Sequence, residues 1–358
     1  MTPAVPTTAP TTTAPSKSAT KLSAAAGPEA IPADTRAALA ALYAPIRDEL
    51  SAVDDRLRSE LQSRYPFIDE LVKHAFRLGG KRLRPALLLL SAKSVGQVRD
   101  EHITLGAVIE MIHTATLVHD DVLDEAKLRR HVDTVNARWD NEASVLLGDY
   151  LFSHAFYLAA TTGSTLACQI IGRATNITCE GELRQVRAGG DLQLAETEYL
   201  GIIEAKTAEL CACACELGAH YAGGDDAAAA ALAAYGRNLG IAFQIADDLL
   251  DLVGEENAVG KSLGTDLEKR KATLPVIHLL ANATAGDRAT IEAILTRPDN
   301  HRVADMLPWL ERYRSFAYAR GKARDFAAAA VASLQELPAS VERDVLAQMA
   351  GFVVSRDR

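Results

Sequence analysis

Two groups of aspartates in this sequence have the spacing of a divalent-metal site. The pattern Asp-Asp-x-x-Asp occurs at residues 120–124 and again at residues 247–251. A helix turns by about 100° per residue, so the first and last aspartates of the pattern point within about 40° of each other. Each group therefore gathers three carboxylates on one side of its helix. The six candidate metal ligands are Asp120, Asp121, Asp124, Asp247, Asp248 and Asp251.

Both groups end stretches that are otherwise apolar, where unpaired charges are costly. Val108, Ile112 and Leu117 precede the first group, and Ile241 and Ile245 precede the second. A solvated acidic helix end is the alternative for either group taken alone. Two groups opposed across a bundle instead make an all-oxygen site for Mg²⁺, which prefers a few carboxylates completed by water and substrate phosphates. The pair therefore predicts Mg²⁺ as the cofactor and a diphosphate as the substrate.

A diphosphate also needs cationic groups from the protein, and two clusters supply them. Residues 79–85 place Lys81, Arg82 and Arg84 directly after a Gly-Gly turn. Arginine binds phosphate oxygens through paired N–H groups, and lysine adds a point charge. The second cluster follows the first aspartates, where its alternative role is to neutralise those acids. Its members are Lys127, Arg129, Arg130 and His131.

Two histidines near the first group allow alternative interpretations. His113 lies two turns before Asp120 on nearly the same helix side, where it could donate to a phosphate or simply pack in the core. The dipeptide His119-Asp120 resembles the metal pair of HD-type phosphohydrolases. That class leaves Asp121, Asp124 and the second group without a role, so it remains the alternative from a different enzyme class.

Helices are expected to position all of these residues. Aromatic residues make up 5% of the chain, and no run of alternating β-branched residues recurs. This composition predicts an all-α fold, and the lack of an internal repeat predicts a single large helical bundle rather than a solenoid. Expected helices cover residues 85–94, 101–124, 143–160, 166–188, 196–222, 227–252 and 274–280, with others before residue 79 and after residue 287.

Composition divides the chain into two regions. Residues 1–32 are rich in Thr, Pro, Ala and Ser with few large apolar side chains, so a disordered low-complexity tail is expected there. This segment lacks the apolar core of a signal peptide and the arginines of a transit peptide. Residues 33–358 are expected to form one helical domain.

Charge, hydropathy and cysteine content limit the class of protein. The formal net charge of −9 argues against nucleic acid as a partner. No stretch approaches the roughly 20 apolar residues of a transmembrane helix, so a soluble protein is expected. The five cysteines show no paired spacing, which suits a reducing compartment, and a cytoplasmic location is expected.

The run Cys211-Ala-Cys213-Ala-Cys215 invites a metal interpretation. Residues two apart lie on different sides of a helix, so only Cys211 and Cys215 share a face, and no histidine cluster completes a tetrahedral site. We therefore expect these cysteines to be small buried packing residues.

Five segments, in order, resemble the trans-isoprenyl diphosphate synthase family. They are GGKRLRP, HTATLVHDDVLDEAKLRR, EAKTAEL, FQIADDLLD and GKSLGTDLEKRKATLP, and they run from Gly79 to about Pro275. One such segment could occur by chance, whereas five in this order are specific. The resemblance implies the isoprenoid synthase fold, a helical bundle around a central cavity, usually as a homodimer, with Mg²⁺ ions bridging both aspartate groups and an allylic diphosphate.

The resemblance also implies individual roles. Asp120, Asp124 and Asp247 would bind the metals, and the other three aspartates would do so directly or through water. Isopentenyl diphosphate would be held by Lys81, Arg84, His113 and Arg130. The allylic diphosphate would be contacted by Arg129, Lys206, Thr207, Gln244, Lys261 and Lys271, of which Lys206 and Lys261 would join the aspartates in catalysis. Arg270 departs from the family, which often has glycine before the second lysine.

The expected reaction has three stages. Mg²⁺ and the cations draw charge onto the leaving diphosphate, so the allylic carbon–oxygen bond ionises. The double bond of isopentenyl diphosphate then adds to the carbocation in a dry cavity. Loss of a proton, with the released pyrophosphate as the expected base, restores a longer allylic diphosphate.

Product length is expected to depend on Ala115 and Thr116, which precede Asp120 by about one turn. In the family, bulky aromatic residues there form a floor that stops growth, and small residues leave the cavity open. These two residues predict a long all-trans product, suited to a quinone side chain, from a primer such as farnesyl diphosphate. Release of such a product would involve transient contact with a membrane.

Three further alternatives remain. A short-chain synthase, making farnesyl or geranylgeranyl diphosphate, would share every motif. A terpene cyclase usually replaces the second aspartate group with an Asn/Ser/Glu triad. A non-catalytic subunit of a heteromeric synthase typically loses an acidic group, whereas both groups are intact here.

Overall fold

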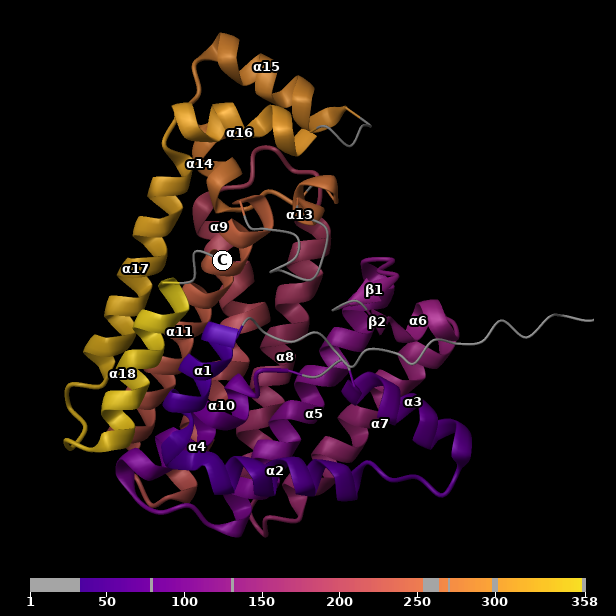
Figure 1. The fold of residues 1–358 in the computed structure, drawn as a ribbon, viewed down its shortest axis with the longest axis vertical. Helices are drawn as coiled ribbons and strands as arrows, with labels where there is room; N and C mark the ends of the chain where they lie inside the picture. Colours follow the sequence, from indigo (N-terminus) through magenta and orange to yellow (C-terminus); the bar gives the residue numbers. More distant parts are fainter. Residues whose placement is uncertain are drawn as a thin grey trace, which may run out of the picture.

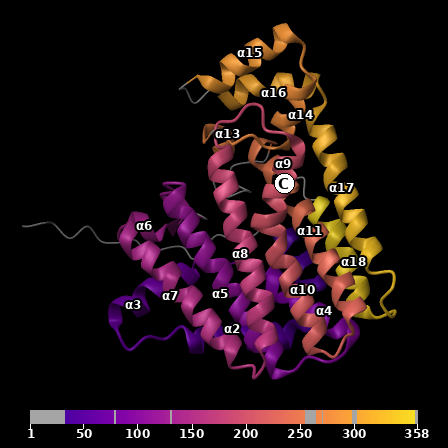
Figure 2. The ribbon, with the colours of Figure 1, turned by 180° about the vertical axis from the view of Figure 1, so that it is seen from behind.

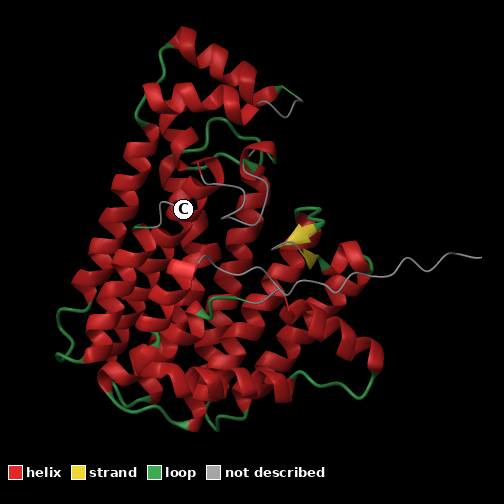
Figure 3. Ribbon diagram, viewed as in Figure 1, coloured by secondary structure: helices red, strands yellow, loops and turns green. Residues whose placement is uncertain are grey.

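The computed structural model describes residues 33–77, 80–129, 132–253, 264–269, 271–297 and 302–355. Most of these residues lie in helices, which confirms the predicted all-α class (Figure 3). In the described part of the chain, the only strands form an antiparallel ribbon in which Leu128 pairs with Asp133 and Arg129 with Val132. The sequence did not predict this ribbon, because its strands are only two residues long. The expected tail, residues 1–32, lies outside the described residues.

Figure 1 shows the order of the elements along the chain. Between residues 83 and 282, all but one of the predicted helices end within two residues of the observed bounds. The elements are α1 (Ala33–Leu42), η1 (Ala44–Ile46), α2 (Arg47–Glu60), α3 (Pro66–Arg77), α4 (Leu83–Val95), α5 (Asp100–Leu123), β1 (Leu128–Arg129), β2 (Val132–Asp133), α6 (Val135–Arg138), α7 (Asn141–Ala160), α8 (Thr165–Ala188), α9 (Glu196–Ile203), η2 (Glu204–Ala208), α10 (Glu209–Tyr221), α11 (Asp226–Val253), α13 (Thr265–Glu268), α14 (Leu274–Asn282), α15 (Ala285–Thr296), α16 (Arg302–Arg312), α17 (Ser315–Ser333) and α18 (Val341–Val354).

The remaining prediction, one helix over residues 196–222, was wrong at its centre, where the π-helical turn η2 separates α9 from α10. Glycines let the neighbouring helices approach this turn. A Cβ on Gly181 of α8 would lie 2.8 Å from the backbone nitrogen of Lys206, and one on Gly240 of α11 would lie 2.5 Å from the Cα of Ala208. Such turns are rare in helices and frequent at functional sites. The sequence carries no glycine or proline within the turn that would have signalled it.

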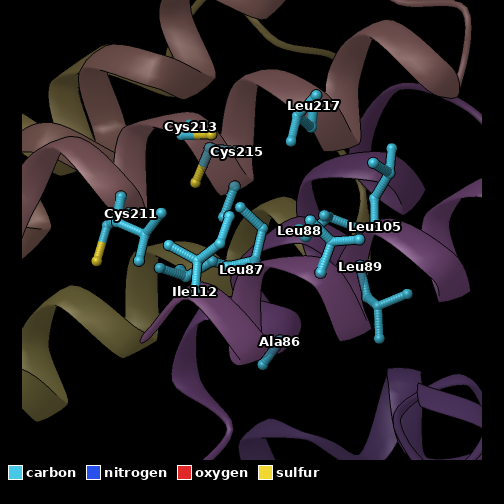
Figure 4. Close-up of a cluster of buried hydrophobic side chains, with 14 of the residues drawn as sticks. Ala86, Leu87, Leu88, Leu89, Leu105, Ile112, Cys211, Cys213, Cys215 and Leu217 are labelled. Carbon is cyan, nitrogen blue, oxygen red and sulfur yellow. The ribbon is translucent and has the colours of Figure 1, made fainter. Parts of the chain in front are cut away.

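The core of the bundle surrounds α4, which packs against α2, α5, α10 and α18. Every residue from Pro85 to Ala92 is buried, so α4 is enclosed on all sides. Figure 4 shows Leu87, Leu88 and Leu89 of α4 close to Leu105 and Ile112 of α5 and to Cys211 and Cys215 of α10. Figures 1 and 2 show α5, α8, α10 and α11 running side by side. None of the described helices is long and apolar enough to cross a membrane.

The three cysteines of α10 are buried, which confirms that they are packing residues. Burial raises the pKa of each thiol, that of Cys215 to about 12. Only Cys211 and Cys215 were expected to share a face, but Cys213 is buried as well. The reason is that α4, α8 and α11 enclose α10 from different sides.

The long helix α11 joins two apolar clusters. Leu232 and Leu239, in its first half, belong to the cluster around α4, α5 and α10. Ile245 and Leu249, in its second half, belong to a cluster that includes residues of α9, α14, α16 and α17. The second aspartate group lies in this second half, between Ile245 and Leu252, which both belong to the second cluster. Apolar packing therefore holds the helix before and after the group.

Candidate active site

The first aspartate group occupies the C-terminal end of α5, where Asp124 is the cap residue. Asp121 is only 1% exposed and is paired with Arg129 of β1, whose Nε donates to its Oδ1 at 2.9 Å. Burial raises the pKa of Asp121, although Arg129 acts in the opposite direction. Its second oxygen, Oδ2, is buried and has no hydrogen-bond partner among the described residues. An unpaired buried carboxylate oxygen is costly, so Asp121 is suited to receive a cation or a donor.

Three lysines face the other two aspartates of this group. Lys206 of η2 places its Nζ 3.3 Å from Asp120 Oδ2. The Nζ atoms of Lys269 and Lys271 lie 3.0 Å and 3.5 Å from the two carboxylate oxygens of Asp124. Burial acts to raise the pKa of Asp124, but the charges of Lys271 and Lys269 outweigh it, so this pKa lies below its ordinary value. The π-helical turn and the segment after α13 thus supply ammonium groups to the end of α5.

Glu182 of α8 is a member of this cluster that the sequence analysis missed. Its Oε2 lies 2.5 Å from Lys206 Nζ, so Lys206 bridges Glu182 and Asp120. Burial, and then the charge of Asp120, raises the pKa of Glu182. The only signal in the sequence is its place beside Gly181, the glycine that lets η2 approach α8. A lone acid on a helix with exposed residues gives no reason to assign it to a site.

The second aspartate group lies at the C-terminal end of α11, and its contacts differ from those of the first group. Asp248 is 5% exposed and accepts hydrogen bonds from Tyr199 Oη and Gln244 Nε2, both at 2.7 Å. Gln244 in turn accepts from Thr207 Oγ1 at 2.9 Å. Burial, and then the charge of Asp266, raises the pKa of Asp248 to about 7. Tyr199 was also missed by the sequence analysis, since a single tyrosine in a helix is usually a core residue.

Asp251 organises the segment that carries two of the lysines. It is 1% exposed, its Oδ2 accepts from the backbone nitrogen of Asp266 at 3.1 Å, and its carbonyl accepts from that of Gly264 at 2.6 Å. The carbonyl of Asp266 then accepts from the backbone nitrogen of Lys271 at 2.8 Å. Because Lys271 also contacts Asp124, this chain of contacts connects the two aspartate groups.

The remaining aspartate, Asp247, is half-buried, like Asp120 and Asp124. The six aspartates therefore fall into two sets. Three are almost fully buried and have donors within the protein, namely Asp121, Asp248 and Asp251. Three retain partial exposure, namely Asp120, Asp124 and Asp247.

Divalent metal fits this arrangement only in part before substrate binds. Among the described residues, no three acidic, histidine or cysteine side chains are gathered closely enough to hold an ion by themselves. Lysine ammonium groups instead stand beside Asp120 and Asp124, where they supply the positive charge that a hard cation would supply. Mg²⁺ is commonly bound through one or two carboxylates together with substrate phosphates and water. The unpaired oxygen of Asp121 and the displaceable lysines are compatible with that mode.

The three cationic residues at the start of α4 have different partners in the structure. Arg82, expected as one of three phosphate ligands, is instead paired with Asp54 and Glu110. Lys81 and Arg84 are half-buried, and the buried Nε of Arg84 finds no hydrogen-bond partner in the part of the chain that the structure describes. The other predicted binder of this subsite, His113, lies on α5 two turns before the first aspartates.

The two residues predicted to set product length lie within the described part of the chain. Ala115 is fully buried, and Thr116 is half-buried with its hydroxyl donating to the carbonyl of His113 at 2.8 Å. Arg130 and Lys261 lie outside the described residues. A cavity of about 810 Å³ opens beside α9, α14, α15 and α17, and its lining includes Glu196, Ala272 and Tyr318 but none of the six aspartates.

Comparisons with known proteins identify the family to which this fold belongs. A polyprenyl synthase from Caulobacter crescentus, solved with calcium and isoprenyl diphosphate, has 37% identity and a TM-score of 0.85, covering 89% of this chain and 98% of that chain. A decaprenyl diphosphate synthase structure from Rhodobacter capsulatus has 38% identity and a TM-score of 0.84, covering 89% and 99%. Octaprenyl diphosphate synthase of Haemophilus influenzae is 37% identical over 310 residues, 86% of this chain and 94% of that protein. The profile of the polyprenyl synthetase family matches residues 65–309, and the chain belongs to this family.

Proposed function

We propose that this chain is a long-chain all-trans polyprenyl diphosphate synthase. It condenses isopentenyl diphosphate onto an allylic diphosphate such as farnesyl diphosphate, and membership of the polyprenyl synthetase family makes it a prenyltransferase. The observation that carries the proposal is that Lys206, Lys269 and Lys271 contact the first aspartate group. These lysines lie in η2 and in the segment after α13, and hydrogen bonds connect both of these elements to the second aspartate group. A cluster of alternating acids and lysines at the ends of two helices is what a metal-bound diphosphate requires.

In this proposal Mg²⁺ is the cofactor, with Asp120, Asp124 and Asp247 as its principal ligands. Their partial exposure supports this division, because a ligand needs an accessible oxygen. The buried Asp248 and Asp251, which accept hydrogen bonds within the protein, act mainly by holding the site in shape or through water. Asp121, whose Oδ2 is unpaired among the described residues, acts directly or through water. When bound, Mg²⁺ supplies positive charge that stabilises the leaving diphosphate.

The cationic residues are assigned to two diphosphates. Isopentenyl diphosphate is held by Lys81, Arg84, His113 and Arg130. The unpaired Nε of Arg84 supports this assignment, since a buried cationic nitrogen needs an anionic acceptor. The allylic diphosphate is bound or approached by Arg129, Lys206, Thr207, Gln244, Lys261 and Lys271.

The protein itself contributes positive charge near the leaving diphosphate, orientation of the two substrates and exclusion of water from the site. Lys206 is released from Asp120 and Glu182 to follow the diphosphate as its ester bond breaks, and its positive charge stabilises the negative charge that develops on the leaving diphosphate in the transition state. The apolar faces of α5 and its neighbours exclude water from the carbocation. Addition of the isopentenyl double bond and loss of a proton to pyrophosphate complete each cycle.

Product length is set, in this proposal, beside Ala115 and Thr116. Both are small, and Thr116 is the more exposed of the two. The long-chain names of the relatives from Haemophilus influenzae and Rhodobacter capsulatus support a long product. Thr116→Phe should shorten the product, as should Ala115→Phe if its tightly packed site accommodates the ring. An unchanged product length with both variants would place the floor elsewhere.

We further propose a homodimer in the cytoplasm. Large apolar side chains are exposed on α7 and α8, including Leu146 at 67%, Tyr157 at 66% and Leu183 at 71%. A face of this kind marks an interaction surface. Leu183→Lys should lower the mass seen by sedimentation equilibrium from dimer to monomer, whereas an already monomeric wild-type chain would exclude the dimer.

The decisive test is a reaction with the purified chain alone. Mg²⁺, farnesyl diphosphate and labelled isopentenyl diphosphate are supplied, and products are separated by chromatography and identified by mass. A long polyprenyl diphosphate is expected, and its loss with EDTA would support the metal requirement. A product that stops at the geranylgeranyl stage would favour the short-chain alternative. Absence of any extended product would overturn the synthase proposal for the chain acting alone.

A further inference from the structure

The two arginines at the start of α4 differ in their partners. Arg82 donates from Nε to Asp54 Oδ1 at 2.8 Å and from Nη1 to Glu110 Oε1 at 2.6 Å. Asp54 belongs to α2 and Glu110 to α5, so one guanidinium joins two helices to the start of α4. Arg84, two residues later, has a buried Nε to which no described residue offers a hydrogen-bond acceptor. Arg82 is therefore occupied by the protein, and Arg84 is the arginine that needs an external anion.

The backbone of this segment is held in an uncommon conformation. Arg82 lies in the left-handed region, with φ 49° and ψ 34°, which is unfavourable for a residue with a Cβ. Tyr43 Oη donates to the carbonyl of Lys81 at 2.9 Å. Gly80 passes so close to Glu110 that a Cβ there would lie 3.3 Å from Oε1. Such a backbone persists only where its surroundings hold it, and the two carboxylates and the tyrosine do so.

Glu110 connects this segment to the helix that carries other residues of the candidate site. Glu110 is 3% exposed and lies on α5 one turn before His113. The ion pair with Arg82 thus fixes the segment to the same helix that carries His113 and the first aspartate group. A buried carboxylate paired with an arginine tolerates little displacement, because separating the charges leaves one of them unpaired.

We propose that Asp54, Arg82 and Glu110 are positioning residues for isopentenyl diphosphate. Their ion pairs hold residues 80–84 in the left-handed turn that directs Lys81 and Arg84 to its diphosphate beside His113. This inference rests on the proposed function and adds residues that do not themselves touch substrate. It concerns only the acceptor substrate, since the allylic diphosphate is assigned to a different set of cations.

The test compares the Michaelis constants of the two substrates. Asp54→Asn and Glu110→Gln keep the size of each side chain and remove its charge. Each is expected to raise KM for isopentenyl diphosphate by about tenfold while KM for farnesyl diphosphate changes by less than about twofold. Glu49→Gln is the matched control, because Glu49 also joins α2 to α4, through Lys93 Nζ at 2.5 Å, away from the turn. It should leave both KM values near those of the wild type.

Three outcomes separate the possible explanations. Equal rises in both KM values, or a fall in kcat alone, would overturn the positioning role. If Glu110→Gln loses the fold by circular dichroism, Asp54→Asn decides the matter, because the Asp54 side chain is 32% exposed and its loss is tolerable. If the wild-type chain extends no substrate, the proposed function fails instead, and that result is distinct from an active enzyme whose KM values do not separate.

Discussion

The two aspartate groups share one sequence pattern but have different surroundings. In the first group, Asp120 and Asp124 face the ammonium groups of Lys206, Lys269 and Lys271. In the second group, the side chain of Asp248 accepts hydrogen bonds from a tyrosine and a glutamine, and that of Asp251 accepts one from a backbone nitrogen. The pattern alone determines that three carboxylates share a helix side. Residues from elsewhere in the chain determine whether a carboxylate is neutralised by displaceable cations or built into the scaffold.

This difference assigns the groups different tasks. A lysine on a flexible, partly exposed side chain can leave a carboxylate at small cost when a metal and a diphosphate arrive. A buried hydrogen bond to Asp248 or Asp251 is lost only at the full cost of an unsatisfied group. The first group is therefore expected to change its partners during the reaction, and the second to keep most of them.

The largest expected effect separates activity from stability. Asp120→Asn should lower kcat by about 1,000-fold or more while leaving the melting temperature nearly unchanged, because Asp120 is half-buried. Asp251→Asn should lower the melting temperature, because it weakens the acceptor of the Asp266 backbone nitrogen. Steady-state kinetics and circular dichroism measure the two effects. Equal destabilisation by both substitutions would remove the proposed difference between the groups.

The next effect concerns the hydrogen bonds of the second group. Tyr199→Phe removes a donor from buried Asp248 and should cost about 1 to 2 kcal/mol of unfolding free energy, together with about a tenfold loss of kcat. Tyr235→Phe is the matched control, since the buried Tyr235 hydroxyl donates to the carbonyl of Leu346 at 2.7 Å, away from the site. It should cost similar stability in urea unfolding with unchanged kcat. Equal loss of activity in both variants would contradict a specific role for Tyr199.

The pH dependence of stability should also differ between the groups in metal-free protein. The pKa of Asp248 is raised to about 7, so the folded state binds more protons than the unfolded state between about pH 4 and pH 7. Wild-type stability from this group therefore falls as pH rises through that range. Asp248→Asn removes this loss, so its stability relative to wild type should rise from pH 4 to pH 7.

Asp124→Asn should show no such rise over this pH range, because the pKa of Asp124 is lowered in the folded state. Its stabilising contribution is fully present above the ordinary pKa of aspartate and is lost as pH falls through the lower folded value. The difference between Asp124→Asn and wild type should therefore be flat from pH 4 to pH 7. Urea unfolding at several pH values, with EDTA present, measures both slopes. Parallel slopes for the two variants would contradict the comparison.

The smallest expected effect tests whether lysine competes with metal. Lys269→Gln removes an ammonium 3.0 Å from Asp124, in a pair that is about one third exposed on both sides. Such a pair contributes less than about 1 kcal/mol. The Mg²⁺ concentration for half-maximal activity should therefore fall by up to about threefold. An increase in that concentration would show that Lys269 assists metal binding rather than opposing it.

Most of the fold could be predicted from the sequence, because its helices are long and their ends are marked by changes in the apolar pattern. The apolar spacing along α5, α8 and α11 set their bounds to within two residues. The π-helical turn was not predictable in the same way, since it depends on Gly181 and Gly240 lying in other helices. The two-residue strands are likewise too short to leave a pattern.

The candidate site was predictable where one segment carries the chemistry. Both aspartate groups and most of the cations belong to such segments. Glu182 and Tyr199 were missed because each acts through a partner distant in sequence, Lys206 and Asp248. Arg82 was expected at the phosphates and lies in ion pairs instead, since Asp54 and Glu110 reach it only in the folded chain. Charge type is visible in a sequence, whereas the partner of each charge is not.

The central claim is that the two aspartate groups are halves of one site, and a double-mutant cycle tests it most directly. The kcat for incorporation of labelled isopentenyl diphosphate is measured for Asp120→Asn, Asp247→Asn and the double variant. Residues that act as a unit give non-additive losses. The double variant is therefore expected to be about as active as the weaker single variant. A loss equal to the product of the two single losses would show that the groups act independently and would contradict the claim.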